Sequence, residues 1–178
     1  MRTVNVSWNK QAGRFTAVGR QPGHVLSINA PALPTEPDRG PTGFSPTELL
    51  LAGAGSCSLW DVVEILRKRR ADVDSLDVVV EGHQAADPPW AYRQIAFHYR
   101  AAGDGLKVAV LARVIRLSIV RYCSVITTIA GVAAISATVE LVDRDGTSTG
   151  RVPIELAIPA APLPPDLEPL SDEDGLPA

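Results

Sequence analysis

The sequence predicts an α+β fold, because strand-like and helix-like hydrophobic patterns come in separate groups rather than in strict alternation. Three short runs of alternating apolar residues come first, followed by a long apolar helix, two strands, a pair of helices and a closing strand. The 178-residue chain is 46% hydrophobic, which is enough to bury the core of one domain. Aromatic residues make up only 5%, so aliphatic side chains must fill most of that core.

The first three strands are predicted to form an antiparallel meander, because short alternating runs are separated by turn residues. These runs are Val4 to Trp8, Phe15 to Val18 and Val25 to Ile28. A proline-rich segment from Pro31 to Gly43 follows. Its composition is incompatible with a helix or an internal strand and predicts a loop.

The clearest helix signal in the chain begins at Ser45. Pro46 suits the first helical position, and Glu48 lies three residues after Ser45, which together form a capping box. We expect this helix to run from about Pro46 to about Arg70. Its first half is apolar nearly all round, as in helices buried on most sides. Such burial is unusual in a small monomer, so we expect a homodimer.

The second half of the pattern predicts two strands, two helices and one more strand. Their ranges are 76–82, 92–100, 106–122, 125–130 and 135–142. After Asp143 the chain becomes loop-like, and proline then accumulates with Asp and Glu. We therefore predict one domain at residues 1–143, followed at 144–178 by a loop and a largely disordered, Pro-rich acidic tail.

Charge and hydropathy argue against several classes of partner. The net charge of −3 gives no reason to expect nucleic acid or an anionic membrane. The longest apolar stretch, around Leu49 to Leu59, is interrupted by Gly and Ser and is shorter than a bilayer-spanning segment. The first ten residues contain no long apolar run typical of a targeting segment. We therefore expect a cytoplasmic protein.

The two cysteines, Cys57 and Cys123, are the main candidates for a functional site. In a reducing compartment they are not expected to form a permanent disulfide. They remain open to three interpretations, which are buried core thiols, metal ligands or a redox pair. Together with a histidine they could bind zinc, but no ligand pair has finger-like spacing. The three histidines are scattered, at His24, His83 and His98. We expect neither a metal nor a cofactor.

Two segments around the cysteines resemble motifs of the OsmC/Ohr family. The segment from Gly43 to Cys57 resembles the first-cysteine helix of that family, and Arg121 to Val125 resembles its second-cysteine motif. Asp61 to Val63, Leu76 to Gly82 and Pro89 to Tyr99 match as well. The resemblance covers roughly residues 1–143. It implies an OsmC-like fold, with antiparallel sheets around a long central helix in an intertwined homodimer, and thiol sites near the subunit interface.

The resemblance also implies a reaction. In the hydroperoxidases of the family the first cysteine is peroxidatic and the second is resolving, roles that fall by position on Cys57 and Cys123. Attack on a peroxide would convert the first thiolate to a sulfenic acid, which the second thiol would condense to a disulfide. The implied substrate is a small hydrophobic organic hydroperoxide, and the implied partner is a dithiol reductant.

The charged residues that activate such a thiol differ from the pattern of the hydroperoxidases. Those proteins use an arginine held by a glutamate that directly follows the helix-start proline, a position held here by Thr47. Glu48 comes one residue later, about 100° around the helix. It is therefore a candidate catalytic residue and, alternatively, a capping-box partner. Arg39 is the candidate arginine, with Arg14 and Arg20 as alternatives.

This departure from the pattern resembles a less characterised OsmC-like branch, and it keeps a second function open. That alternative is a non-peroxidatic protein of the same fold that binds a small molecule or handles sulfur, with its cysteines in a pocket at the dimer interface.

Overall fold

The computed structural model describes residues 3–21, 23–31 and 40–158. It confirms the α+β class, with strands, helices and strands following one another in the predicted order and one further strand at the end. Contacts divide the chain into two units, residues 1–57 and 58–178, and the division falls inside helix α1 (Pro46–Lys68).

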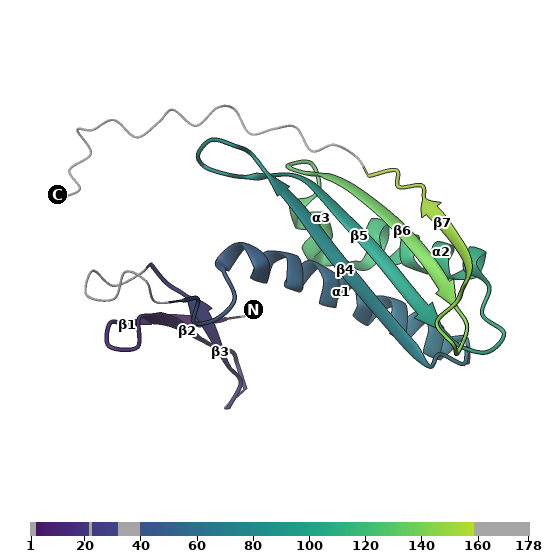
Figure 1. The fold of residues 1–178 in the computed structure, drawn as a ribbon, viewed down its shortest axis with the longest axis horizontal. Helices are drawn as coiled ribbons and strands as arrows, with labels where there is room; N and C mark the ends of the chain where they lie inside the picture. Colours follow the sequence, from purple (N-terminus) through teal and green to yellow (C-terminus); the bar gives the residue numbers. More distant parts are fainter. Residues whose placement is uncertain (1–2, 22, 32–39, 159–178) are drawn as a thin grey trace. The chain divides into compact units, whose positions relative to one another are not determined.

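The first unit contains the predicted meander. Its strands are β1 (Asn5–Asn9), β2 (Arg14–Val18) and β3 (Val25–Asn29). They pair antiparallel in the order β1-β2-β3 (Figure 1). The β1–β2 turn contains Gly13 at a φ of 56°, a conformation that glycine adopts without steric cost. Most of the predicted proline-rich loop, residues 32–39, lies outside the described residues.

Backbone contacts with β3 fix the chain just before α1. Phe44 forms an isolated parallel bridge with Ile28, and the N–H of Asn29 donates to the carbonyl of Phe44 over 2.8 Å. A Cβ atom at Gly43 would collide with the carbonyl oxygen of Ser27. Glycine is therefore required here for the chain to pass β3 at this distance.

Local signals define both ends of α1. At its start, the N–H of Ser45 donates to Glu48 Oε2 over 2.7 Å and the N–H of Glu48 donates to Ser45 Oγ over 3.2 Å, which confirms the capping box. At its end, Arg70 has a φ of 55° and the N–H of Ala71 donates to the carbonyl of Leu66. This is a Schellman motif, which ends the helix at Lys68 rather than at the predicted Arg70.

The sequence indicated that helix α1 is buried on most sides, but in the structure it is buried along one stripe. The stripe has a spacing of four residues and contains Ala54, Ser58, Val62 and Leu66. By contrast, Leu50, Trp60 and Val63 are 39%, 74% and 49% exposed. By length and composition alone, the 23-residue helix is apolar enough to cross a membrane, because it extends beyond the apolar stretch around Leu49 to Leu59. Core helices of soluble proteins have the same composition.

The second unit contains a four-stranded sheet in the order β4-β5-β6-β7. Its strands are β4 (Ser75–Gln84), β5 (Tyr92–Ala102), β6 (Ala134–Val142) and β7 (Ser148–Ile154). The β4–β5 and β6–β7 pairs are antiparallel, whereas β5 and β6 are parallel. The sheet is therefore mixed, because the chain crosses over between β5 and β6 through helices.

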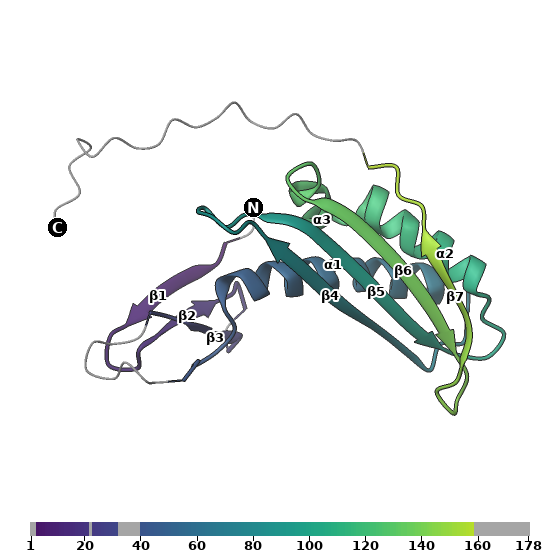
Figure 2. The same ribbon diagram turned by 45° about the horizontal axis from the view of Figure 1, so that its top comes forward.

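The crossover places three helical segments against one face of this sheet (Figure 2). They are α2 (Val108–Leu117), the π-helical turn η1 (Ser118–Tyr122) and α3 (Ser124–Ile129). The sequence predicted one continuous helix over residues 106–122, so the π-helical turn was not foreseen. Alternate residues of β5 face these helices and are buried, namely Ile95, Phe97, Tyr99 and Ala101.

Strand β7 corrects the predicted domain boundary. Residues 144–178 were expected to form a loop and a largely disordered tail, but Ser148–Ile154 pairs with β6. Pro153 lies within this strand. It is tolerated because β7 is an edge strand, so one side of its backbone makes no ladder hydrogen bonds. Residues 159–178 lie outside the described residues.

Candidate functional site

Cys57 lies in the middle of α1 and is half-buried. Helical periodicity determines which side chains accompany it. Asp61 follows four residues later, so the two side chains lie one above the other on the same face. Ser58, the next residue, belongs to the buried stripe. Cys57 is thus presented by a continuous helix at the edge of that stripe.

Cys123 lies between η1 and α3 and is completely buried. Its N–H donates to the carbonyl of Ser118 over 2.8 Å, which closes the wide π-helical turn. Its side chain caps α3, where Sγ accepts a hydrogen bond from the N–H of Ile126 over 3.4 Å. The thiol therefore takes the place of the oxygen that usually caps a helix N-terminus.

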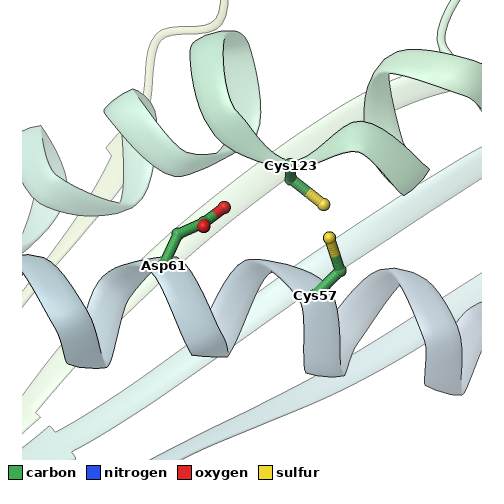
Figure 3. A group of neighbouring side chains, drawn as sticks. All are labelled: Cys57, Asp61 and Cys123. Carbon is green, nitrogen blue, oxygen red and sulfur yellow. The ribbon is translucent and has the colours of Figure 1, made fainter.

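The structure brings the two cysteines together with a carboxylate. Cys57 Sγ, Cys123 Sγ and a carboxylate oxygen of Asp61 all lie within 4.8 Å of one another (Figure 3). The two thiols are not joined in a disulfide. Figure 3 shows the two sulfur atoms pointing toward each other, with the Asp61 carboxylate beside them. We call these three residues the thiol–carboxylate cluster.

A chain of hydroxyl groups holds the carboxylate from its buried side. The Ser118 hydroxyl has two acceptors in reach, Asp61 Oδ2 at 3.2 Å and the carbonyl of Ser58 at 3.1 Å. Ser118 Oγ also lies 2.9 Å from Ser58 Oγ, which lies 2.6 Å from the hydroxyl of Tyr99. An ionised carboxylate can only accept, so a consistent proton order runs from Tyr99 through Ser58 and Ser118 to Asp61.

Burial keeps Tyr99 in its neutral form. Loss of hydration raises its pKa well above the usual range, and the hydrogen bond with Ser58 opposes that rise only in part. The nearby Cys123 and Asp61 add smaller contributions that also raise the pKa. Tyr99 therefore remains a hydrogen-bond donor at the buried end of the chain of hydroxyl groups.

The structure places Glu48 outside the thiol–carboxylate cluster. Its carboxylate is exposed and accepts the Ser45 N–H, and this backbone hydrogen bond, with one from the Ser45 side chain, lowers the pKa of Glu48. Thr47 lies beside it, with Oγ1 3.2 Å from Ser45 Oγ. The observed contacts of Glu48 are those of a capping residue, and its catalytic role stays a prediction.

The candidate arginines differ in what the structure says of them. Arg39 lies outside the described residues. Arg14 is an exposed residue of β2, and Arg20 is exposed in the turn that follows. Among the described residues, no arginine or lysine forms an ion pair with Asp61. The arginine that serves the thiols therefore stays a prediction.

No histidine of the described residues joins the cysteines. His98 Nδ1 lies 3.0 Å from Thr138 Oγ1 and its Nε2 lies 3.5 Å from Glu81. His24 and His83 are exposed. The group that lies beside the two sulfur atoms is instead the Asp61 carboxylate.

Sequence reasoning missed four residues of this region. They are Ser58, Asp61, Tyr99 and Ser118. One signal was available, since a cysteine and an aspartate four residues apart on a helix share a face. The other contacts join positions far apart in the chain, for which a single sequence carries no signal.

Comparisons with known proteins agree with the predicted resemblance. A family model described as OsmC-like protein matches residues 38–140. Protein YhfA of Escherichia coli K12 is 41% identical over 81 residues, which are 46% of this chain and 60% of YhfA. The chain therefore matches somewhat more than half of that relative's length.

Two solved structures show the same fold at low identity. An OsmC like protein from Mycoplasma pneumoniae is 20% identical with a TM-score of 0.64, covering 79% of this chain and 96% of that one. The organic hydroperoxide resistance protein OhrB of Bacillus subtilis is 13% identical with a TM-score of 0.52, covering 79% of this chain and 97% of that one.

Proposed function

The chain belongs to the OsmC-like protein family, and from that premise we propose that it is a thiol peroxidase that reduces organic hydroperoxides. The observation that carries the proposal is the distance between the two reduced cysteines, whose sulfur atoms lie within 4.8 Å. Two buried or half-buried thiols this close form a disulfide after a small movement of either side chain. Structural neighbours named as hydroperoxide resistance proteins support the same chemistry.

In the proposed reaction the Cys57 thiolate attacks one oxygen of the peroxide bond. Its sulfur is oxidised to a sulfenic acid, and the other oxygen leaves as an alcohol after taking a proton. The Cys123 thiol then attacks the sulfenic sulfur, which forms a disulfide and releases water. An external dithiol returns the disulfide to two thiols by exchange.

Exposure and helix structure support this division of roles. Cys57 is half-buried, so peroxide reaches it more readily than the completely buried Cys123. Asp61 lies beside both sulfur atoms and is suited to accept the proton that Cys57 loses. The hydrogen bond from Ser118 holds that carboxylate in place. Asp61 would then return the proton to the leaving alkoxide.

The experiment adds a stoichiometric amount of cumene hydroperoxide to the reduced protein. We expect rapid loss of peroxide and a Cys57–Cys123 disulfide in the peptide mass spectrum, followed by turnover with a dithiol such as dihydrolipoamide. Absence of the disulfide, together with absence of turnover with several dithiols, would refute the proposal.

A non-peroxidatic function is the second candidate, because Glu48 is engaged with Ser45 and Thr47 takes the place of the expected glutamate. In this alternative the cysteines bind a small molecule or carry sulfur as a persulfide. Native mass spectrometry of the freshly purified protein would then show a bound mass or a persulfide on Cys57. Stoichiometric disulfide formation by hydroperoxide would exclude it.

We also propose that the protein acts as a homodimer in a reducing, cytoplasmic setting. The exposed apolar residues of α1 support a second copy as their cover, with Trp60 74% exposed. Sedimentation equilibrium is expected to give twice the chain mass, and Trp60→Lys is expected to weaken the assembly. A monomer at micromolar concentration would contradict this part of the proposal.

A further inference from the structure

The thiol–carboxylate cluster has the donor set of a metal site as well as that of a redox pair. Its three ligand atoms are two thiol sulfurs and one carboxylate oxygen, all within 4.8 Å of one another. Two soft sulfur ligands combined with one harder oxygen favour a borderline divalent ion such as zinc. Three protein ligands also leave one position of a tetrahedral ion for water.

The distances decide how well the reduced cluster suits such an ion. With Zn–S bonds of about 2.3 Å, two tetrahedral thiolate ligands lie about 3.8 Å apart. The cluster therefore needs its sulfurs to approach by at most about 1 Å for zinc. A disulfide, with a bond of about 2.05 Å, needs an approach of up to roughly 2.7 Å. The existing arrangement is thus compatible with metal coordination as well as with disulfide formation.

Neighbouring groups support two of the three potential ligands, Cys123 and Asp61. The Ile126 N–H donates to Cys123 Sγ over 3.4 Å, a contact that favours the negative charge of a thiolate. Ser118 Oγ donates to one oxygen of Asp61, which leaves the other oxygen available. Outer contacts of this kind orient metal ligands and raise affinity. Ser58 and Tyr99 extend them into the core.

The negative charge of the ionised cluster also favours a bound cation. When both thiols and Asp61 are ionised, three negative charges lie within 4.8 Å. Among the described residues no lysine or arginine pairs with Asp61. A divalent cation between the three atoms offsets that repulsion, since a bound metal ion is the largest local charge in a site and favours deprotonated thiols.

We propose that the reduced protein binds Zn²⁺ through Cys57 Sγ, Cys123 Sγ and Asp61. Binding displaces the two thiol protons and changes no oxidation state. Oxidation of the cysteines to a disulfide removes both sulfur ligands, so the metal-bound and disulfide states exclude each other. The inference goes beyond the proposed peroxidase, because it requires only the dithiol form and no peroxide.

The experiment titrates reduced full-length protein with Co²⁺ and then Zn²⁺ in the absence of peroxide. We expect one ion per chain, a thiolate-to-cobalt charge-transfer band, visible bands typical of tetrahedral cobalt, and loss of both spectra when zinc displaces the cobalt. Zinc is also expected to raise the melting temperature, because it binds only the folded cluster.

Matched variants connect the signal to the cluster. Cys57→Ser and Cys123→Ser are each expected to lose the tetrahedral cobalt spectrum, and Asp61→Asn to weaken zinc binding by about tenfold or more. Glu64→Gln is the control, because this carboxylate lies one turn further on α1 and pairs with Arg67. Circular dichroism without metal establishes that each variant is folded, and Asp61→Glu is expected to restore part of the affinity.

The outcomes separate this inference from the peroxidase proposal. A cobalt spectrum that persists in both cysteine variants overturns the site, as does an absence of zinc binding at micromolar concentration. Equal zinc affinity in wild-type and Asp61→Asn protein also overturns it. Disulfide formation by hydroperoxide is measured on metal-free protein, so either proposal can fail while the other stands.

Discussion

The two cysteine-bearing segments place their thiols by different means. Cys57 belongs to an uninterrupted 23-residue helix whose periodicity also sets the position of Asp61. Cys123 lies where a π-helical turn gives way to a six-residue helix, and its backbone is extended, with φ −71° and ψ 101°. One thiol is half-buried, whereas the other is completely buried.

This difference matters for reactivity. A thiol in the middle of a long helix moves only by changing its side-chain rotamer, because the backbone is held on both sides. The break at Cys123 is also held, because its N–H donates to the carbonyl of Ser118 and its own carbonyl accepts the Thr127 N–H. Cys123 is in addition completely buried. The comparison therefore assigns both the approach to the peroxide and the closing side-chain movement to the half-buried Cys57.

The largest expected effect is on peroxidase activity, and it distinguishes the role of Cys57 from that of Cys123. Cys57→Ser is expected to lower kcat/KM for cumene hydroperoxide by at least about 10³-fold, because the nucleophile is removed. Cys123→Ser is expected to consume one peroxide per chain and stop at the sulfenic acid. Stopped-flow peroxide consumption and trapping of the sulfenic acid with dimedone measure both. If Cys123→Ser loses the first turnover too, the two roles are not separate.

The next largest expected effect is on stability, and it tests the contacts of Ser118 with the helix that carries Cys57. Ser118→Ala removes the hydroxyl that donates to Asp61 and meets Ser58, so Asp61 loses a donor and Ser58 keeps only its contact with Tyr99. We expect unfolding free energy to fall by about 1–3 kcal/mol, as measured by urea denaturation. Ser136→Ala on β6 is exposed and is the control, with an expected change within about 0.5 kcal/mol.

A smaller effect concerns the buried end of the same hydroxyl chain. Tyr99→Phe retains the ring and removes the contact with Ser58, so we expect a loss of about 0.5–1.5 kcal/mol near neutral pH. Burial raises the pKa of Tyr99 in the folded protein, so its stabilisation is complete below the ordinary tyrosine pKa and is lost as pH rises further.

Urea denaturation between about pH 8 and pH 11 tests whether the contribution of Tyr99 to stability falls as pH rises. Wild-type protein is expected to lose stability more steeply than Tyr99→Phe above roughly pH 10. Tyr122→Phe serves as the control, because Tyr122 is 55% exposed. Parallel pH curves for wild-type and Tyr99→Phe protein would contradict the neutral buried hydroxyl.

The smallest expected effect concerns the start of the helix that carries Cys57. The hydrogen bonds from Ser45 lower the pKa of Glu48, so the contribution of its carboxylate is present near neutral pH and is lost as pH falls through that lowered pKa. Glu48→Gln is expected to flatten the acid end of the melting-temperature profile slightly, and Glu155→Gln, at an exposed residue after β7, is the matched control. A large fall in peroxidase activity in Glu48→Gln would instead favour the catalytic role.

Local signals explain what the sequence could predict. The start of α1 depends on Ser45, Pro46 and Glu48, which are close in the chain and form the expected capping box. The meander and the order of elements follow from hydrophobic period and turn residues. Both cysteines were identified because each lies within a short motif of the family.

The features that the sequence did not predict depend on contacts between distant residues or on local irregularities of a helix or strand. Tyr99 meets Ser58 across 41 positions, and Ser118 meets Ser58 across 60. The π-helical turn continues an apolar helical pattern, so periodicity alone does not reveal it. Strand β7 was not predicted, because its proline and the polar residues before it are typical of a loop. An edge strand nevertheless tolerates both.

The π-helical turn η1 determines how the chain responds to a change in length just before Cys123. A π turn holds one residue more than an α-helical turn, so deletion of a single residue between Ser118 and Cys123 would keep the side chains of the cluster in the protein. Such a deletion would convert the π turn into an α-helical turn and leave Cys123 at nearly its present angle, because the shorter turn still completes one revolution. Deletion of one residue from the regular helix α2 would instead rotate everything after it by about 100°. In protein engineering terms, η1 is the part of this crossover where chain length can change while the two thiols stay together.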